Sequence, residues 1–392
     1  MTNQSILNGI RIFDFTWVLA GPYATRIMAD FGAEVIKVQP MLPEAEDAFS
    51  HGYYNAWNRN KLGVTLNLNK PEGVVIARKL VSISDAVVEN FTPRVMANWG
   101  LDYTNLKKLK PDLIMLSMST MGQTGPWRDY AGFGPTVHAF SGMTSLTGYP
   151  GEPPVGLGFS YADHVAGMFA CLALLSALEY HRRTGEGQYI DVSQVEAMSS
   201  LLGDAILDYT GDGKQTEPMG NSSTRAAPHG VYRCHGEDRW CTIAVYSNED
   251  WQGFKQALGN PPWAKEVRFA TIASRLENSK ELDGLVEEWT KEHNAEEIMT
   301  LLQEHGVAAG VVQDASDLAN DPQLKSRGFF VKLEHPETGK AISDATPIKL
   351  PDMPARYTRA APTQGQDNEH VYRELLGLSD NEIARLTEQG II

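Results

Sequence analysis

An extended apolar run lies between Val165 and Leu178, where almost every position is small or hydrophobic. A sequence that is apolar all round a helical period predicts a helix that is buried on every side. One carboxylate, Asp163, precedes the run and follows the segment Gly158–Ala162, which includes the small residues Gly158, Ser160 and Ala162. We therefore expect a buried core helix that begins near Ala162 and carries Asp163 in its first turn.

The first half of the chain alternates between strand and helix patterns. Branched and alternating residues predict strands at 10–15, 34–38, 63–68, 85–89, 113–117 and 189–192. Helical periodicity predicts helices at 23–30, 71–81, 101–109 and 193–209. This alternation favours a doubly wound α/β domain with a parallel sheet covered on both faces. The turn after the first strand has one glycine instead of GxGxxG, so no dinucleotide site is predicted.

The remaining segments predict a second, smaller unit and a return to the first. Residues 40–60 read as a polar irregular connection, and the Gly- and Pro-rich segment 128–159 as a long ordered loop that lines a site. The predicted division is 1–210 for the first part of a large domain, 211–229 for a linker, 230–320 for a small domain and 321–392 for the return. The small domain is expected to hold a hairpin at 230–245, helices at 248–258, 281–293 and 295–305, and a strand at 307–312. Final helices are expected at 368–376 and 379–389.

The net charge, the apolar stretches and the cysteines of the chain limit its expected partners and cellular location. A net charge of −15 argues against nucleic acid as the main partner, although a small anionic ligand needs only a local pocket. No stretch is read as a membrane span and no secretory signal is visible, so we expect a cytoplasmic protein. The cysteines Cys171, Cys234 and Cys241 form no CxxC pair, which fits a reducing compartment. No metal site is expected, because Cys234, His235 and Cys241 lack a fourth ligand at finger-like spacing.

Asp163 has two interpretations from the residues alone. Unpaired N–H groups and the macrodipole at a helix start favour an anion, so Asp163 can simply stabilise the helix. It can also be a carboxylate kept ionised at the floor of a cleft and used as a nucleophile. The neighbouring His164 is not expected to act as its partner, because adjacent positions of a helix do not face each other.

A set of short motifs extends over nearly the whole chain. In order these are Asp14-Phe-Thr-Trp-Val-Leu-Ala-Gly-Pro22, Gly32-Ala-Glu-Val-Ile-Lys37, Asn58-Arg-Asn-Lys61, Val88-Glu-Asn-Phe91, Gly122-Gln-Thr-Gly-Pro126, Tyr161-Ala-Asp163, Arg183-Thr-Gly-Glu-Gly-Gln188 and Glu374-Leu-Leu-Gly-Leu-Ser-Asp-Asn-Glu-Ile383. Their order and spacing resemble the family III CoA-transferases, the CaiB/BaiF family.

The resemblance implies a fold and a reaction. The fold is a large Rossmann-like domain with a parallel sheet built from both chain ends, a small α+β domain between them, and two protomers interlinked like rings. The substrates are an acyl-CoA and a free organic acid, with coenzyme A as substrate and no separate cofactor. In this family the aspartate at the position of Asp163 attacks the acyl-CoA carbonyl, and CoA then passes through an aspartyl-CoA thioester to the acceptor acid.

The resemblance also implies which residues bind CoA or substrate. Trp17, Val18 and Ala20 match the segment whose backbone lies along the thioester, and Asn90 and Phe91 match residues that line the CoA channel. The other expected binding residues are Arg59, Lys61, Leu66, Arg94 and Phe133.

The chain departs from the family pattern in two ways. Arginines that often serve the CoA phosphates are replaced by Gln39-Pro40 and Asn98-Trp99, so Arg94, Arg59, Lys61 and Lys70 are the remaining basic candidates. A glycine run that caps the active site in some members is missing at Asn221–Gly230, which leaves open how water is excluded.

Two alternative functions remain at this stage. An α-methylacyl-CoA racemase would need a second base, and Phe133 stands where that branch has a histidine, with His138 five residues further on. A non-catalytic CoA-binding subunit of a hetero-oligomer is the other alternative, which the intact Asp163 disfavours. For a transferase we expect a succinyl-CoA type donor, an organic acid acceptor, and a homodimer or a pair with a paralogue.

Overall fold

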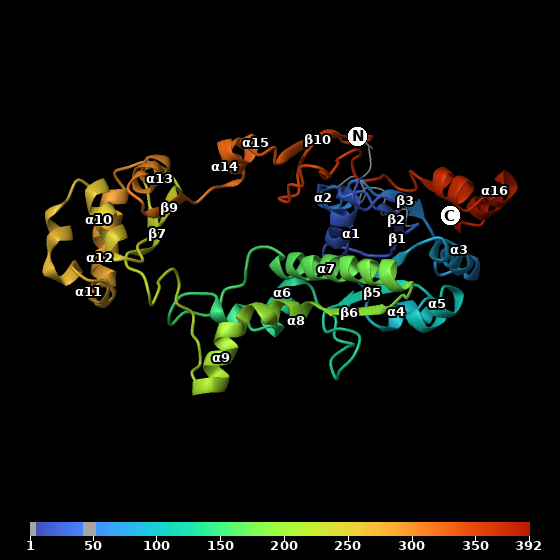
Figure 1. Cartoon of the computed structure of the whole chain (residues 1–392), viewed down its shortest axis with the longest axis horizontal. Helices are drawn as coiled ribbons and strands as arrows, with labels where there is room; N and C mark the ends of the chain where they lie inside the picture. Colours follow the sequence, from blue (N-terminus) through green and yellow to red (C-terminus); the bar gives the residue numbers. More distant parts are fainter. Residues whose placement is uncertain (1–4, 42–51) are drawn as a thin grey trace. The chain divides into compact units, whose positions relative to one another are not determined.

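The protein is described by a computed structural model, which covers residues 5–41 and 52–392. Two compact units are formed, the first by Met1–Thr144, Gly156–Gln215 and Leu324–Ile392, and the second by Ser145–Val155 and Thr216–Gln323. The second unit thus includes residues 145–155, which the sequence analysis had assigned to the large domain. Figure 1 shows the course of the chain through both units.

A six-stranded parallel sheet with the order β3-β2-β1-β4-β5-β6 forms the centre of the first unit. Its strands are β1 (Arg11–Asp14), β2 (Glu34–Gln39), β3 (Leu62–Thr65), β4 (Ala86–Glu89), β5 (Ile114–Ser119) and β6 (Tyr189–Ser193). The order reverses between β1 and β4, and ligands of doubly wound sheets bind at such a switch point. The predicted α/β class with a parallel sheet is confirmed.

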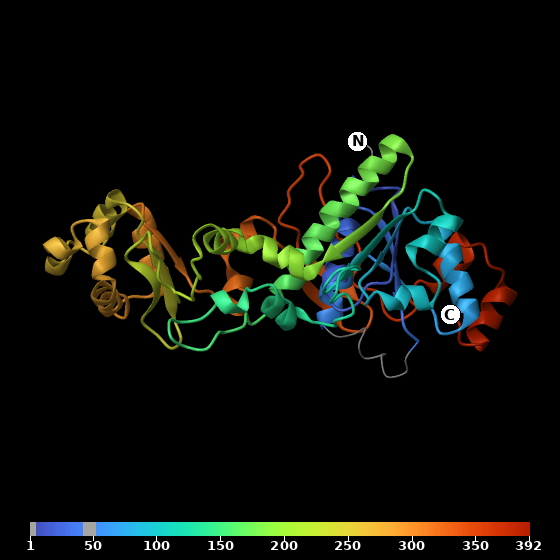
Figure 2. The same ribbon diagram turned by 90° about the horizontal axis from the view of Figure 1, so that it is seen from below.

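Alternate residues of each central strand enter two different hydrophobic clusters. Ile12, Val88 and Leu116 face the cluster under α1 (Ala20–Asp30) and α7 (Tyr161–Thr184). Phe13, Val87 and Met115 face the opposite cluster, which includes residues of α3 (Pro71–Ser82), α5 (Tyr103–Leu109) and α16 (Asp380–Glu388). Both faces of the sheet are therefore covered, as Figure 2 also shows, and this explains why the central strands carry apolar residues on both of their alternating faces.

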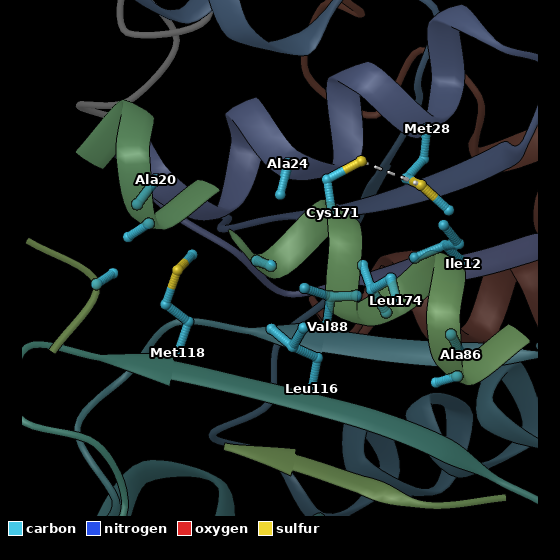
Figure 3. Packing of buried hydrophobic residues seen from close by; sticks show 14 of the residues in the cluster. Ile12, Ala20, Ala24, Met28, Ala86, Val88, Leu116, Met118, Cys171 and Leu174 are labelled. Atoms are coloured by element: carbon cyan, nitrogen blue, oxygen red, sulfur yellow. Dashed lines mark hydrogen bonds between the residues drawn. The ribbon is translucent and has the colours of Figure 1, made fainter. Parts of the chain in front are cut away.

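Helices α1 and α7 pack closely against each other over the sheet. Figure 3 shows small residues of both helices above Val88 and Leu116, with the thiol of Cys171 3.7 Å from the sulfur of Met28. Gly167 permits this approach, since a Cβ there would lie 2.7 Å from the carbonyl oxygen of Ala20 and 2.9 Å from the Tyr23 ring. The first residue of α1, Ala20, is thereby held against Gly167, which lies one helical turn after Asp163 along α7.

Gly167→Val should destabilise the protein by about 1–3 kcal/mol, because the added atoms must push α1 away from α7. The comparison is Gly284→Ala in α12 (Ser279–Thr290), where a Cβ would meet nothing within 4 Å. Urea unfolding of both variants measures the difference. Equal midpoints for the two variants would contradict the close contact described here.

The prediction that α7 is buried on every side is wrong for the single chain. Met168, Phe169, Leu172 and Leu175 are exposed, and Leu172 has 62% of its surface accessible. The sheet and α1 cover only one side of the helix, so the apolar residues of its other side have no cover from residues 5–41 and 52–392. By length and composition α7 could also cross a membrane, contrary to the sequence-based expectation, yet 56% of its most apolar window is buried, as for the core helix of a globular domain.

The rest of the first unit consists of short helices and a hairpin. These are α2 (Gly52–Asn58), α4 (Arg94–Asn98), α6 (Gly134–Phe140), α8 (Gln194–Ser199), α9 (Gly203–Asp212), the antiparallel pair β10 (Phe330–His335) and β11 (Gly339–Asp344), and a π-helical segment at His370–Leu375. The helix α15 (Pro322–Ser326) crosses the boundary between the two units, which lies between Gln323 and Leu324. The helix α6 interrupts the segment read as loop, and α2 lies within the segment read as irregular. Residues 42–51 of that connection are outside the described residues.

The second unit has an antiparallel sheet of the order β7-β8-β9. Its elements are β7 (His229–Arg233), β8 (Trp240–Ala244), α10 (Asn248–Ala257), α11 (Ile272–Glu277), α12, α13 (Ala295–Glu304), β9 (Ala308–Val311) and α14 (Ala315–Asn320). Trp251, Phe254 and Phe269 lie at the centre of its own hydrophobic core. The predicted hairpin, helices and strand are all present, which agrees with a small α+β unit.

Candidate active site

The loops after β1 and β4 meet at the switch point of the sheet. The amide side chain of Asn90 accepts the N–H of Trp17 at 2.7 Å and donates to the Trp17 carbonyl at 2.9 Å. Val18 follows with a φ of +62°, which costs a branched residue free energy and persists only when its surroundings impose it. The predicted residues Trp17, Val18 and Asn90 are therefore brought together in one rigid turn.

A cavity of about 340 Å³ opens beside this turn. It is lined by the predicted residues Trp17, Leu66 and Phe91, and also by Phe15, Val38, Pro40, Met41, Asn67, Leu68, Asn69 and Trp99. The walls come from the carboxyl ends of β1 to β4 and are largely apolar. They can hold a flat or aliphatic group, while no basic side chain belongs to the lining that the structure describes.

Asp163 lies in the first turn of α7, with 9% of its surface accessible. The buried imidazole of His138 accepts the N–H of the preceding Ala162 through Nε2 at 3.0 Å and so fixes the start of the helix. Burial raises the pKa of Asp163 above its usual range, against the opposing effects of His164 and the Ser160 hydroxyl. A poorly solvated carboxylate of this kind is more basic and easier to bring to a carbonyl carbon than one surrounded by water.

Gly134, at the start of α6, lies directly against this carboxylate. A Cβ on Gly134 would be 2.9 Å from Asp163 Oδ2 and 3.0 Å from the Ser160 hydroxyl. The preceding residue Phe133 has 70% of its surface accessible. A side chain at residue 134 would displace the Asp163 carboxylate.

Aromatic side chains of α2 complete the surroundings, and the sequence analysis did not find them. Tyr53 is close enough for the charge of Asp163 to raise the Tyr53 pKa, in addition to the effect of burial. The Trp57 ring packs edge-on against the His164 ring at 5.2 Å, and the Tyr23 ring lies 5.0 Å from His164. The spacing of Tyr53 and Trp57, four residues apart, was the available signal for a helix with an aromatic face.

The two predicted cations Arg59 and Lys61 have other partners. Both are fully buried, Arg59 against Asp30 at 2.6 Å and Lys61 against Asp14 at 3.1 Å. Neither has any accessible surface with which to contact a phosphate. The predicted role in phosphate binding is therefore replaced by ion pairing inside the fold, because the carboxylates that attract them lie deep in the first unit.

The remaining predicted residues have different environments. Ala20 is fully buried at the start of α1, with its carbonyl oxygen against α7, whereas Arg94 is exposed on α4 and 3.5 Å from Asp129. Lys70 is bonded through Nζ to the carbonyl of Gln389. Residues 221–230 belong to the second unit. Within residues 5–41 and 52–392, no cluster of three or more His, Cys, Asp or Glu could hold a metal.

Comparison with known proteins gives consistent matches over almost the whole chain. The family model described as CoA-transferase family III matches residues 7–368. The succinyl-CoA–D-citramalate CoA-transferase of Chloroflexus aurantiacus is 34% identical, and the match covers 98% of each chain. The alpha subunit of a succinyl-CoA–L-malate CoA-transferase from Chloroflexus aurantiacus is 35% identical, over 99% of this chain and 93% of that subunit. A crystal structure of a CaiB/BaiF family protein from Brucella suis has a TM-score of 0.87 at 31% identity, over 95% of this chain and all of that one.

Proposed function

The chain belongs to CoA-transferase family III, and on that premise we propose that it moves CoA from succinyl-CoA to a short dicarboxylic acid, with Asp163 as nucleophile. The observation that carries this assignment is the Asp163 carboxylate itself, which is buried at a helix start and adjoins Gly134, which has no side chain. The names of the relatives, which act on citramalate and malate, support the class of acids.

In the proposed reaction each step exchanges one activated acyl bond, a thioester or an anhydride, for another, so the activation of the acyl group is conserved. A carboxylate oxygen of Asp163 adds to the thioester carbonyl, the C–S bond breaks, and CoA thiolate leaves a mixed anhydride on the enzyme. The thiolate attacks the aspartyl carbonyl and releases succinate. The acceptor carboxylate then displaces CoA from the aspartyl thioester, and the thiolate attacks the acceptor acyl carbon, which regenerates Asp163. CoA acts only as a substrate in this scheme, and no further cofactor is needed.

The surroundings of Asp163 suit this reaction better than racemisation. A racemase needs a second base that can take an α-proton. Phe133 has no such group, and the Nε2 lone pair of the buried His138 is occupied by the N–H of Ala162. The alternative of a non-catalytic subunit has a parallel in the subunit name of one relative, but it gives Asp163 no role.

A substrate panel tests the proposed function. The purified protein is incubated with succinyl-CoA and one free acid at a time, including malate, citramalate, glutarate and a monocarboxylic control, and new thioesters are identified by mass spectrometry. We expect new thioesters of dicarboxylic acids together with free succinate. If succinyl-CoA donates to none of these acids while another acyl-CoA does, the proposed donor is wrong.

We also propose that two copies of this chain associate through the exposed side of α7, as the interlinked dimer of the resemblance implies. Met168, Leu172 and Leu175 form an apolar strip there, and Ile206, Leu207 and Tyr209 of α9 are exposed as well. Apolar surface of this extent on a water-soluble protein is usually covered. Light scattering after gel filtration should give twice the chain mass, and a monomeric mass would contradict the proposal.

The buried free thiols of the chain fit the proposed cytoplasmic location.

A further inference from the structure

A buried cluster of charged side chains lies beside the turn Thr16–Val18 and comes from the end of β1, from β2 and from the residue before β3. The Asp14 carboxylate accepts the N–H of Thr16 at 2.7 Å and the hydroxyl of Thr25 at 2.6 Å. Lys61 lies 3.1 Å and Lys37 3.6 Å from this carboxylate, and Lys37 also donates to the Thr16 carbonyl. Thr16 stands between Phe15 and Trp17, which both line the cavity, so the cluster lies directly behind the cavity wall.

The cluster has more basic than acidic side chains. Two buried lysines face one carboxylate, although a single ammonium group would neutralise Asp14, and burial lowers the pKa of both lysines. Burial alone would raise the pKa of Asp14, but Lys37, Lys61 and the two threonine hydroxyls outweigh it and hold the pKa well below its usual range. Asp14 is therefore ionised at all working pH values, and the net charge of the cluster depends on the lysines.

We propose that Asp14, Lys37 and Lys61 act as positioning residues of the transfer reaction: they fix the turn Thr16–Val18 beside the cavity, and the second lysine lets the cluster carry a positive charge that favours anionic CoA. The inference rests on the proposed function for the identity of the ligand. It explains why the left-handed Val18 backbone persists beside a cavity with no basic side chain among its described lining residues. A charge behind a low-dielectric wall acts on a ligand without touching it.

Lys61 can change its charge near neutral pH. Burial, together with repulsion by Lys37 and Arg26, outweighs the attraction of Asp14 and lowers the pKa of Lys61 to about 7; burial also lowers the pKa of Lys37. Besides Asp14, the hydrogen-bond partners of Lys61 are the uncharged Asn58, Pro22 and Thr25, and Tyr54 of α2 stays protonated because burial raises its pKa. Below pH 7 the ammonium form dominates, and above pH 7 the surplus charge is lost unless an anion restores it.

Calorimetry with CoA as the probe tests the inference. Titrations at pH 7.5 in buffers of different ionisation enthalpy measure the protons taken up on binding. The wild-type protein should take up a fraction of a proton, and its affinity for CoA should fall as pH rises from 6.5 to 8.5. Lys61→Met should lose the uptake and bind CoA on the order of tenfold more weakly, because the variant lacks a unit charge that attracts the anion across a low-dielectric wall.

Lys110→Met is the matched control, because it removes a lysine paired with Asp112 at 3.0 Å near the amino end of β5. It should keep the wild-type proton uptake. Equal uptake in wild type and Lys61→Met would overturn the inference. If Lys61→Met does not fold, the inference is tested with the wild-type protein and Asp163→Asn. If the affinity for CoA falls with rising pH in neither protein, the inference is overturned. The substrate panel is a separate experiment. A wild-type protein that transfers no CoA in that panel would reject the proposed function, but it would not reject the proposed role of the cluster in binding CoA.

Discussion

Asp163→Asn should lower CoA transfer by at least about 1000-fold, because an amide cannot form the anhydride or the aspartyl thioester. The fold should persist. Burial raises the pKa of Asp163 in the folded protein, so its ionised form opposes folding as pH rises through that pKa. The neutral amide removes this cost, and the melting temperature at pH 7 should therefore be no lower than that of the wild type.

Asp102→Asn is the matched control for this variant. Asp102 also stands at a helix start and accepts the N–H of Asn105 at 3.2 Å, but it belongs to α5 on the other face of the sheet. Steady-state transfer from succinyl-CoA should remain close to the wild-type rate in this control. Asp163→Asn with more than a tenth of the wild-type rate would end the assignment of Asp163 as nucleophile.

Gly134→Ala should lower kcat by about 100-fold, with a smaller change in KM. The added Cβ would lie 2.9 Å from Asp163 Oδ2, so the carboxylate must move by a few tenths of an ångström or turn away. Displacement of a reacting group by up to about 1 Å can cost a factor of this size, while CoA binding, which we propose for the cavity at the carboxyl ends of the strands, should be unaffected.

Gly203→Ala provides the comparison for that variant. Gly203 also begins a short helix, α9, and a Cβ there would meet nothing within 4 Å. Its kinetics should match the wild type. If Gly134→Ala also keeps the wild-type kcat, the loop at Gly134 does not constrain the nucleophile.

The fold was predictable wherever the pattern was local. Strands such as 34–38 and 85–89 contain consecutive apolar residues, Val35-Ile36 and Ala86-Val87-Val88, because both sheet faces are covered, and the alternation of strands with helices indicates a parallel sheet before any contact is known. The short helix α2 was missed, because its apolar content is three aromatic side chains in a polar segment. The exposed side of α7 was missed for another reason, since sequence periodicity does not say which chain covers an apolar face.

The candidate site was predictable only in part. Asp163 stands out in the sequence because a carboxylate before a long apolar run is unusual. The roles of Arg59 and Lys61 were not predictable, because their carboxylate partners Asp30 and Asp14 are 29 and 47 residues away in the chain. The approach of Gly134 to Asp163 is likewise a tertiary contact, which no local pattern reveals.

The central claim is that Asp163 forms a covalent bond to its substrate, and trapping that bond tests it most directly. The protein is incubated with succinyl-CoA without an acceptor acid, treated with hydroxylamine or borohydride, and digested for mass spectrometry. The peptide that contains Tyr161-Ala-Asp163 should carry a modification at Asp163, and the same peptide from Asp163→Asn should not. A parallel incubation in heavy water should show no deuterium at the α-carbon of the acyl group. An unmodified peptide together with α-deuterium incorporation would contradict the account.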